Sequence, residues 1–334
     1  IVTIPKPVKR IVTAQWSGGE LVSILNVKDR VVGVPQIYKG EPSYTSPVHG
    51  PEVHTALVLF SDLSELPSIG SRFDPDVEAI LALNPDIVLY QSREALKPSA
   101  EAALEAAGMP AVVIYLWKAG ILKEERLECG YIFNKVDEAK EYIDFCKRYE
   151  DMIRARTEGL SEAERPRVYI ETLEPYQIYA QESWADDLCT MAGGRNIAAG
   201  TDLFGNYVEV DKEWVVKQNP DIIIKSDWWN SGYTVDDISG IKAVWEEVMS
   251  RPELANVNAV KEGKVYVYGA FTSTAQLIVG AAYFAKWIQP DLFEDLDPKE
   301  IHQEYLDKFF GDVDFDLDEH GVFVYHPEEH PEGK

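Results

Sequence analysis

The chain has 334 residues, of which 46% are hydrophobic and 11% aromatic, so it can bury a core large enough for two lobes. Asp and Glu outnumber Lys and Arg by 57 to 32, which gives a net charge of −25. That charge repels phosphate backbones, and we expect no nucleic-acid partner. No window approaches the ~20 apolar residues of a membrane span, because Tyr283 and Lys286 interrupt the best candidate, residues 277–288.

The three cysteines, Cys129, Cys146 and Cys189, form no CxxC pair. Such a pair would indicate a zinc or redox centre. We therefore predict three buried thiols, and we expect neither a bound metal nor a cofactor. Three cysteines cannot all pair in disulfides, so the cysteine count does not distinguish an oxidising from a reducing compartment.

Strands and helices alternate in the first part of the chain. Residues 8–33 read as a strand, a glycine pair, a helix and a second strand, and the same order returns over residues 85–116. There, a strand over 85–90 and a strand over 109–116 flank a helix over 99–107. This alternation is typical of a mostly parallel sheet.

A long helix is predicted over residues 135–158. Apolar residues recur there at steps of three or four, and charged residues occupy the other faces. At 1.5 Å per residue it would span ~36 Å, which is long enough to join two lobes.

The alternation restarts after Pro166. We predict strands over 167–173, 220–227 and 263–269, and helices over 183–192, 274–287 and 298–309. We expect the acidic residues 312–334 to form a surface appendage. The domain prediction is an N-terminal α/β lobe over 1–133, a linker helix over 134–160, a C-terminal α/β lobe over 161–311 and a tail over 312–334.

An internal repeat supports two similar lobes. Residues 76–88, DVEAILALNPDIV, align without gaps on residues 211–223, DKEWVVKQNPDII. Pro85 and Pro220 cannot continue a helix, so both copies stop at the same point before the next strand. The predicted fold class is α/β, with two Rossmann-like lobes of mostly parallel strands joined by a single long helix.

Aromatic residues follow the carboxyl ends of several predicted strands, where open α/β sheets bind ligands. Their flat faces could stack on a large, partly apolar ligand, although each could equally be a core residue. The candidate ligand-binding aromatics are Trp16, Trp117, Trp184, Trp228, Trp229, Tyr233 and Phe271.

Arg72 is a further ligand-binding candidate. It precedes Asp74 and a predicted helix start, so its guanidinium could clamp an anionic ligand group or simply pair with Asp74 or Asp76. Arg195 and Lys225 allow the same two interpretations.

Glu78 and Glu213 occupy equivalent positions in the first turns of the two repeat helices. An acidic residue in the first turn of a helix complements the helix dipole, and this alone can explain a glutamate at such a position. A matched pair on two lobes could also form two docking points, and the residues alone leave both interpretations open.

The motifs of nucleophilic, metal-dependent or phosphate-binding enzymes are missing: the sequence contains no GxSxG, HExxH or GxxxxGKS. His320, His326 and His330 lie among acids near the end of the chain. We interpret them as part of a solvated tail rather than a metal site. We therefore expect a protein that is not an enzyme.

The segments KPVKRIVTAQ, IGSRFDPDVEAILALNPDIVLY and EVDKEWVVKQNPDIII, together with the long helix, resemble the class III substrate-binding proteins of ABC importers. That family takes up iron chelates, haem and vitamin B12. The resemblance covers nearly all of residues 8–310 and leaves the tail outside.

The resemblance implies two lobes joined by one rigid helix, with a ligand held between them. Because the connector is a continuous helix rather than flexible strands, we expect a small closing motion. By motif position, Glu78 and Glu213 would pair with arginines of an ABC permease. The implied cargo is a metal chelate (ferric siderophore, haem or corrinoid). An oxyanion such as molybdate or tungstate, or a two-lobed chelatase-like enzyme, is the alternative.

The resemblance also implies a location outside the cytoplasmic membrane. The protein would be periplasmic or extracellular, either free or anchored to the membrane by a lipid or by an N-terminal segment absent from this chain. The chain opens at Ile1 without a targeting segment, so either none existed or it was removed. We expect a monomer.

Overall fold

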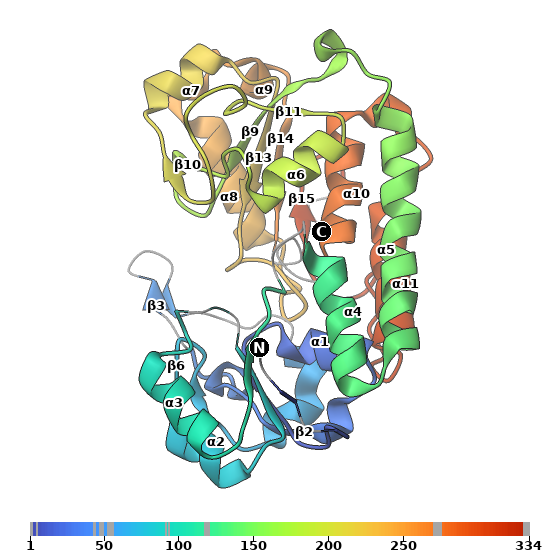
Figure 1. The fold of residues 1–334 in the computed structure, drawn as a ribbon. Coiled ribbons are helices and arrows are strands. Elements are labelled where there is room, and N and C mark those ends of the chain that lie inside the picture. Colours follow the sequence, from blue (N-terminus) through green and yellow to red (C-terminus); the bar gives the residue numbers. More distant parts are fainter. Residues whose placement is uncertain are drawn as a thin grey trace. The chain divides into compact units, whose positions relative to one another are not determined.

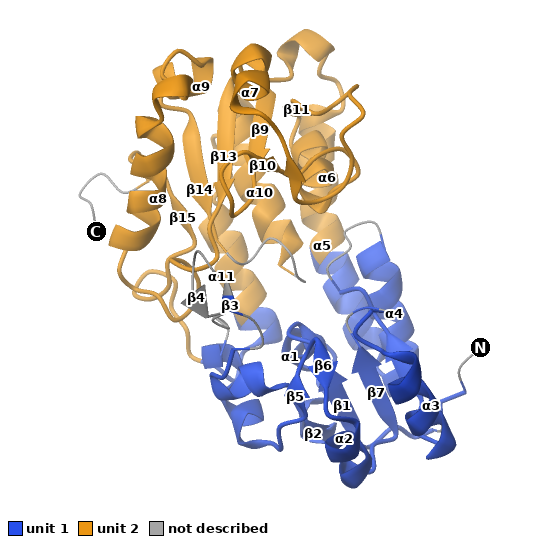
Figure 2. Ribbon diagram, turned by 90° about the vertical axis from the view of Figure 1, so that its left-hand side faces the viewer, with its two compact units in different colours: residues 1–145, 307–313 blue, residues 146–306, 314–334 orange. Residues whose placement is uncertain are grey.

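A computed structural model describes residues 3–4, 6–42, 45–46, 50–51, 57–90, 92, 94–116, 121–269 and 276–329. The chain divides into two compact units, which Figure 2 distinguishes by colour. Unit 1 comprises residues 1–145 and 307–313, and unit 2 comprises residues 146–306 and 314–334.

Unit 1 is built on a four-stranded parallel sheet with the strand order β2-β1-β7-β8. Figure 1 labels β2 and helices α1, α2 and α3 of this unit. Every residue of β1 and β7 is buried, as in a parallel strand that is covered on both faces. The parallel sheet predicted from the alternation is confirmed. Its strands are β1 (Ile11–Ala14), β2 (Val31–Gly33), β7 (Ile87–Tyr90) and β8 (Ala111–Val113).

Helices α2 and α3 pack on one face of this sheet, where Ile80 and Leu104 join Val12 and Val88 in one buried cluster. Helix α4 is not predicted from the sequence, because its buried face carries the charged residues Glu125 and Arg126. The helices are α1 (Gly18–Ile24), α2 (Val77–Leu83), α3 (Pro98–Ala106) and α4 (Leu122–Phe133). Shorter elements are η1 (Lys28–Arg30), η2 (Gln36–Lys39), η3 (Leu57–Glu65), the pair β3 (Thr45–Ser46) and β4 (Gly50–Pro51), and the pair β5 (Gly70–Ser71) and β6 (Asp74–Pro75).

Unit 2 contains a larger, mixed sheet with the order β12-β10-β9-β13-β14-β15. Its central strands β9, β13 and β14 are parallel, and β11 pairs in parallel with β9. Antiparallel strands occupy the edges. The strands are β9 (Arg167–Glu171), β10 (Gln177–Ile178), β11 (Arg195–Asn196), β12 (Val208–Glu209), β13 (Ile222–Ser226), β14 (Val265–Tyr268) and β15 (Val324–Tyr325).

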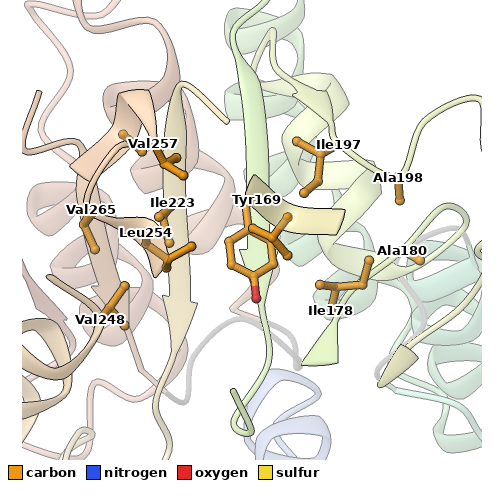
Figure 3. Close-up of a cluster of buried hydrophobic side chains, with 12 residues drawn as sticks. Tyr169, Ile178, Ala180, Ile197, Ala198, Ile223, Val248, Leu254, Val257 and Val265 are labelled. Carbon is orange, nitrogen blue, oxygen red and sulfur yellow. The ribbon is translucent and has the colours of Figure 1, made fainter. Parts of the chain in front are cut away.

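The core of unit 2 lies against β9, β13 and β14, where Tyr169, Ile223 and Val265 meet Val248 and Leu254 (Figure 3). Helix α8 packs on β14, and α6 packs on α10. The helices are α6 (Trp184–Met191), α7 (Lys212–Gln218), α8 (Ser239–Ser250), α9 (Asn258–Lys261) and α10 (Leu277–Ile288), with the single turns η5 (Glu162–Glu164), η6 (Pro252–Leu254) and η8 (Pro290–Leu292).

Two helices, α5 (Val136–Thr157) and α11 (Pro298–Phe309), contribute residues to both units. The predicted long helix is confirmed as α5, which has 22 residues. In unit 1, the ring of Phe309 meets the edges of Tyr142 and Phe145 at centroid distances of 5.7 and 5.5 Å. In unit 2, Arg148 of α5 donates two hydrogen bonds to Glu304 of α11, at 2.5 and 2.6 Å.

For residues 312–329, the prediction of a surface appendage is wrong. Strand β15 pairs antiparallel with β14 and completes the sheet of unit 2. Phe315, Leu317, Phe323 and Tyr325 are buried, because apolar residues recur between the acids of this segment and pack away from solvent. His326 stacks on Tyr266 at a centroid distance of 4.6 Å.

The α/β fold with two units built on largely parallel sheets confirms the predicted fold class. Cys129, Cys146 and Cys189 are free and buried, as predicted. Burial raises the pKa of the Cys129 thiol to about 12, which keeps it protonated at neutral pH. Within the described residues, no helix has both the length and the apolar character needed to cross a membrane.

Candidate functional site

The two repeat helices begin alike and present their glutamates to solvent. Helix α2 follows Asp76 and α7 follows Asp211, and both aspartates have extended backbone geometry. Glu78 and Glu213 lie in the first turns of these helices, and both are exposed. The structure thus leaves both carboxylates accessible to a partner, as docking would require.

The predicted helix ends are also alike. Asn84 and Asn219 end the two helices in the left-handed conformation, with φ of 46° and 44°. Asn tolerates this conformation better than most residues, and the following proline prevents another helical turn. The repeat read from the sequence is therefore a repeat of backbone geometry.

In unit 1, a tight turn after β1 positions Trp16. The Tyr38 hydroxyl donates to the Trp16 carbonyl at 2.6 Å and accepts from the Gly19 amide at 2.7 Å. A Cβ at Gly18 would lie 1.7 Å from Thr13 Oγ1, so only glycine fits there. This turn fixes the backbone of Trp16 at the carboxyl end of β1, where its side chain is partly buried.

Arg72 lies in the loop between β5 and β6, with its guanidinium carbon 4.0 Å from the centroid of the Phe73 ring. Its two suggested partners have other roles. Asp74 pairs with Lys97 at 2.7 Å, and Asp76 accepts hydrogen bonds from the first amides of α2. A ligand-clamping role for Arg72 thus stays a prediction.

In unit 2, the segment after β13 contains Trp228 and Trp229. Its backbone is held by Asp227, whose amide donates to the Tyr268 carbonyl at 2.8 Å and whose carbonyl accepts from the Ser231 hydroxyl at 2.6 Å. Asp227 Oδ1 also accepts from the Trp229 amide at 3.2 Å. Both tryptophans are partly exposed at the carboxyl end of β13.

Two predicted ligand residues are instead packed inside unit 2. Trp184 is 6% exposed and meets Tyr179 edge-on at a centroid distance of 4.9 Å. Tyr233 is 5% exposed, shares a 2.6 Å hydrogen bond with His302 Nε2 and packs against Phe323. These contacts favour the core interpretation for both residues. Trp117 and Phe271 lie outside the described residues.

Lys225 is part of a buried ion network rather than an open anion clamp. Glu171 at the end of β9 is fully buried, lies 3.3 Å from Lys225 Nζ and accepts two hydrogen bonds from Arg251 at 2.7 and 3.0 Å. Lys225 also donates to the carbonyls of Thr172 and Leu173. Arg195 lies 3.7 Å from Glu162, so the pairing interpretation holds for both cations.

The network has a consistent charge state. Burial opposes the ionisation of Glu171, but the charges of Lys225 and Arg251 outweigh burial and hold its pKa below the ordinary value. The Tyr169 hydroxyl adds a hydrogen bond at 2.6 Å. An ionised Glu171 therefore fixes the ends of β9 and β13, the strands that lead into the candidate ligand segment.

Sequence reasoning missed Glu171, Arg251 and Asp227. A signal was present for two of them, because Glu171 and Asp227 are charged residues at the carboxyl ends of strongly apolar strands. A charge at such a position needs a partner or a function. Nothing local indicates Arg251, which is 80 positions from its partner Glu171.

Comparison with known proteins gives the family. Residues 11–271 match the sequence model of the periplasmic binding proteins. The YvrC substrate-binding lipoprotein of an ABC transporter in Bacillus subtilis is 26% identical over 301 residues, which cover 88% of this chain and 84% of YvrC. The molybdate-binding protein MolA of Haemophilus influenzae is 21% identical, with 92% and 88% of the two chains covered.

Two further comparisons concern a partial relative and the fold. The haem uptake protein IsdE of Staphylococcus aureus is 26% identical over 163 residues, covering 48% of this chain and 54% of IsdE. The crystal structure of the TroA-like periplasmic binding protein FepB from Veillonella parvula matches with a TM-score of 0.75 at 23% identity, and 97% and 96% of the two chains are covered. That match shows the same fold.

The chain belongs to the periplasmic binding protein family, in the class III group that serves ABC transporters. It is a substrate-binding component of such a transporter. The resemblance that the sequence motifs indicate is confirmed.

Proposed function

We propose that this protein captures a metal chelate, namely a ferric siderophore, haem or a corrinoid, and delivers it to an ABC permease through Glu78 and Glu213. The observation that carries the docking part is the matched pair of exposed carboxylates in the first turns of α2 and α7. The carboxyl ends of β1 and β13, followed by Trp16, Trp228 and Trp229, would supply the ligand surface.

The aromatic side chains favour a bulky cargo, because stacking on a flat ring system buries large apolar areas. The haem protein among the relatives supports a chelate. The relationship to a molybdate-binding protein supports the alternative cargo, a simple oxyanion such as molybdate or tungstate. Arg72 would be the residue that contacts such an anion.

The protein would work as a monomer outside the cytoplasmic membrane, in a periplasm or tethered by a lipid. The family assignment and the lipoprotein YvrC support this location. Its acidic charge of −25 suits encounter with a basic permease surface. Exposed ion pairs are worth only ~0–1 kcal/mol each, so the two glutamates would orient the complex rather than supply most of its affinity.

Docking is tested by measuring uptake in cells that depend on this chain, with Glu78→Ala, Glu213→Ala and the double variant. Each single change should lower uptake by at most about fivefold, and the double change by about an order of magnitude. Ligand binding by the purified variants should stay unchanged. Glu105→Ala and Glu246→Ala change exposed glutamates on α3 and α8 and serve as controls. Normal uptake by the double variant would contradict docking through this pair.

A further inference from the structure

The segment after β13 contains enclosed polar groups that make no hydrogen bond within the described residues, among them one oxygen of Asp227 and the indole nitrogen of Trp228. Asp227 is 5% exposed, and its Oδ1 accepts from the Trp229 amide and from Asn230 Nδ2 at 3.3 Å. Its second oxygen, Oδ2, is buried and accepts nothing within the described residues. Trp228 Nε1 is likewise buried and, in the same part of the chain, donates to no acceptor.

Unfilled hydrogen-bonding groups at a buried position are costly, most of all on a carboxylate. Burial raises the pKa of Asp227, which reflects this cost. The charge of Lys225 acts on Asp227, but Lys225 Nζ forms its contacts with Glu171 and with the carbonyls of Thr172 and Leu173.

The contrast with the adjacent strand end is informative. Glu171, the last residue of β9, pairs with β13 through Lys225 and is also buried, yet its oxygens accept from Arg251, from Tyr169 and from the Tyr176 amide. At the carboxyl ends of neighbouring strands, the buried carboxylate of Glu171 therefore has hydrogen-bond donors for both of its oxygens. The carboxylate of Asp227 has donors for only one. The unpartnered acceptor and the unpartnered donor belong to consecutive residues, so a ligand group that carries both a donor and an acceptor could satisfy the two of them.

A carboxamide is such a group, since its N–H donates to a carboxylate oxygen and its carbonyl accepts from an indole N–H. We propose that Asp227 and Trp228 are ligand-contact residues, and that they select a neutral metal chelate bearing amide groups over an anionic cargo. This inference rests on the proposed function and narrows its ligand class. A buried carboxylate would repel an oxyanion, so it also argues against the molybdate alternative.

The test combines two neutral, amide-bearing probes, cyanocobalamin and ferrichrome, with two anionic probes, haem and molybdate. The wild type should bind one of the neutral probes most tightly. Asp227→Asn keeps Oδ1 but places an amide N–H where an acceptor is needed, and it should weaken that binding at least tenfold. Trp228→Phe keeps an aromatic ring without the N–H and should weaken it about fivefold. Asp237→Asn, at an exposed aspartate that accepts from Ser239, is the control and should bind like the wild type.

A second readout needs no ligand. Asp227→Asn removes a buried charge while keeping its loop contacts, so the variant should melt at a higher temperature than the wild type. A lower melting temperature would show that the carboxylate is required for folding and would contradict the proposal.

The outcomes separate the two proposals. Binding of cyanocobalamin or ferrichrome that both variants leave unchanged would overturn the inference and support the chelate function. Tightest binding of haem would do the same. Binding of molybdate alone would overturn both the inference and the chelate proposal in favour of the oxyanion. Failure of all four probes to bind would contradict the proposed cargo together with the inference built on it.

Discussion

The two units are alike where their central strands begin and different where those strands end. In unit 1, Asp86 accepts from the backbone amides of Lys9 and Arg10, and the Arg10 guanidinium donates to the carbonyls of Leu83 and Asn84 at the end of α2. In unit 2, Asp221 accepts from the backbone amide of Arg167, and the Arg167 guanidinium donates to the Gln218 carbonyl at the end of α7.

The opposite ends of these strands have diverged in chemistry. The paired residues at the end of β1 and β7 are Ala14 and Tyr90, whereas the equivalent pair in β9 and β13 is Glu171 and Lys225. At the amino ends of these strands, both units thus use the same hydrogen bonds to join a strand to a helix. The carboxyl ends differ between the two units, and open α/β sheets bind ligands at the carboxyl ends of their strands.

The largest effect is expected at Glu171. Replacing it with Ala leaves Lys225 and Arg251 as buried cations without their shared counter-ion, which should cost about 3–5 kcal/mol of unfolding free energy. Urea unfolding measures this loss. Glu162→Ala removes the exposed partner of Arg195 in the same unit; it is the control and should cost far less. A loss below about 1 kcal/mol for Glu171→Ala would show that the network does not stabilise unit 2.

The second effect is a dependence on pH that comes from unit 2. Burial lowers the pKa of His302 to about 3, so the folded state keeps this side chain neutral while the unfolded chain binds a proton near pH 6.5. Stability should therefore fall by about 3 kcal/mol as the pH drops from about 6.5 to about 4.5. His302→Gln should flatten the profile of unfolding free energy against pH in this window. An unchanged slope in the variant would rule out His302 as its source.

The smallest effect concerns the two helix starts. The Asp76 side chain accepts from the amides of Glu78 and Ala79, whereas the Asp211 side chain makes no capping hydrogen bond. Asp76→Ala should therefore cost about 1 kcal/mol, and Asp211→Ala only a few tenths. Equal losses in urea unfolding would mean that the difference between the two caps has no energetic weight.

The repeat was the most predictable part of this fold. The Asn-Pro-Asp segments specify where each helix ends, and the apolar runs that follow specify the strands, so local chemistry is sufficient there. Glu78 and Glu213 could be identified as a pair for the same reason.

The remainder depends on contacts between distant parts of the chain. Arg251 reaches Glu171 across 80 positions, and β15 joins a sheet whose central strands lie far earlier in the sequence. Trp184 and Tyr233 looked like ligand residues because they are aromatic and near predicted element ends. Only the packing shows that Tyr179 and His302 cover them.

The central claim is the capture of a chelate, and titration of the intrinsic tryptophan fluorescence tests it most directly. The fluorescence of Trp16, which follows β1, and of Trp228 and Trp229, which follow β13, should change when a chelate binds at the carboxyl ends of these strands. We predict a saturable, one-to-one change in fluorescence with one of cyanocobalamin, ferrichrome or haem, and none with molybdate. No response to any chelate, or a response to molybdate alone, would contradict the account.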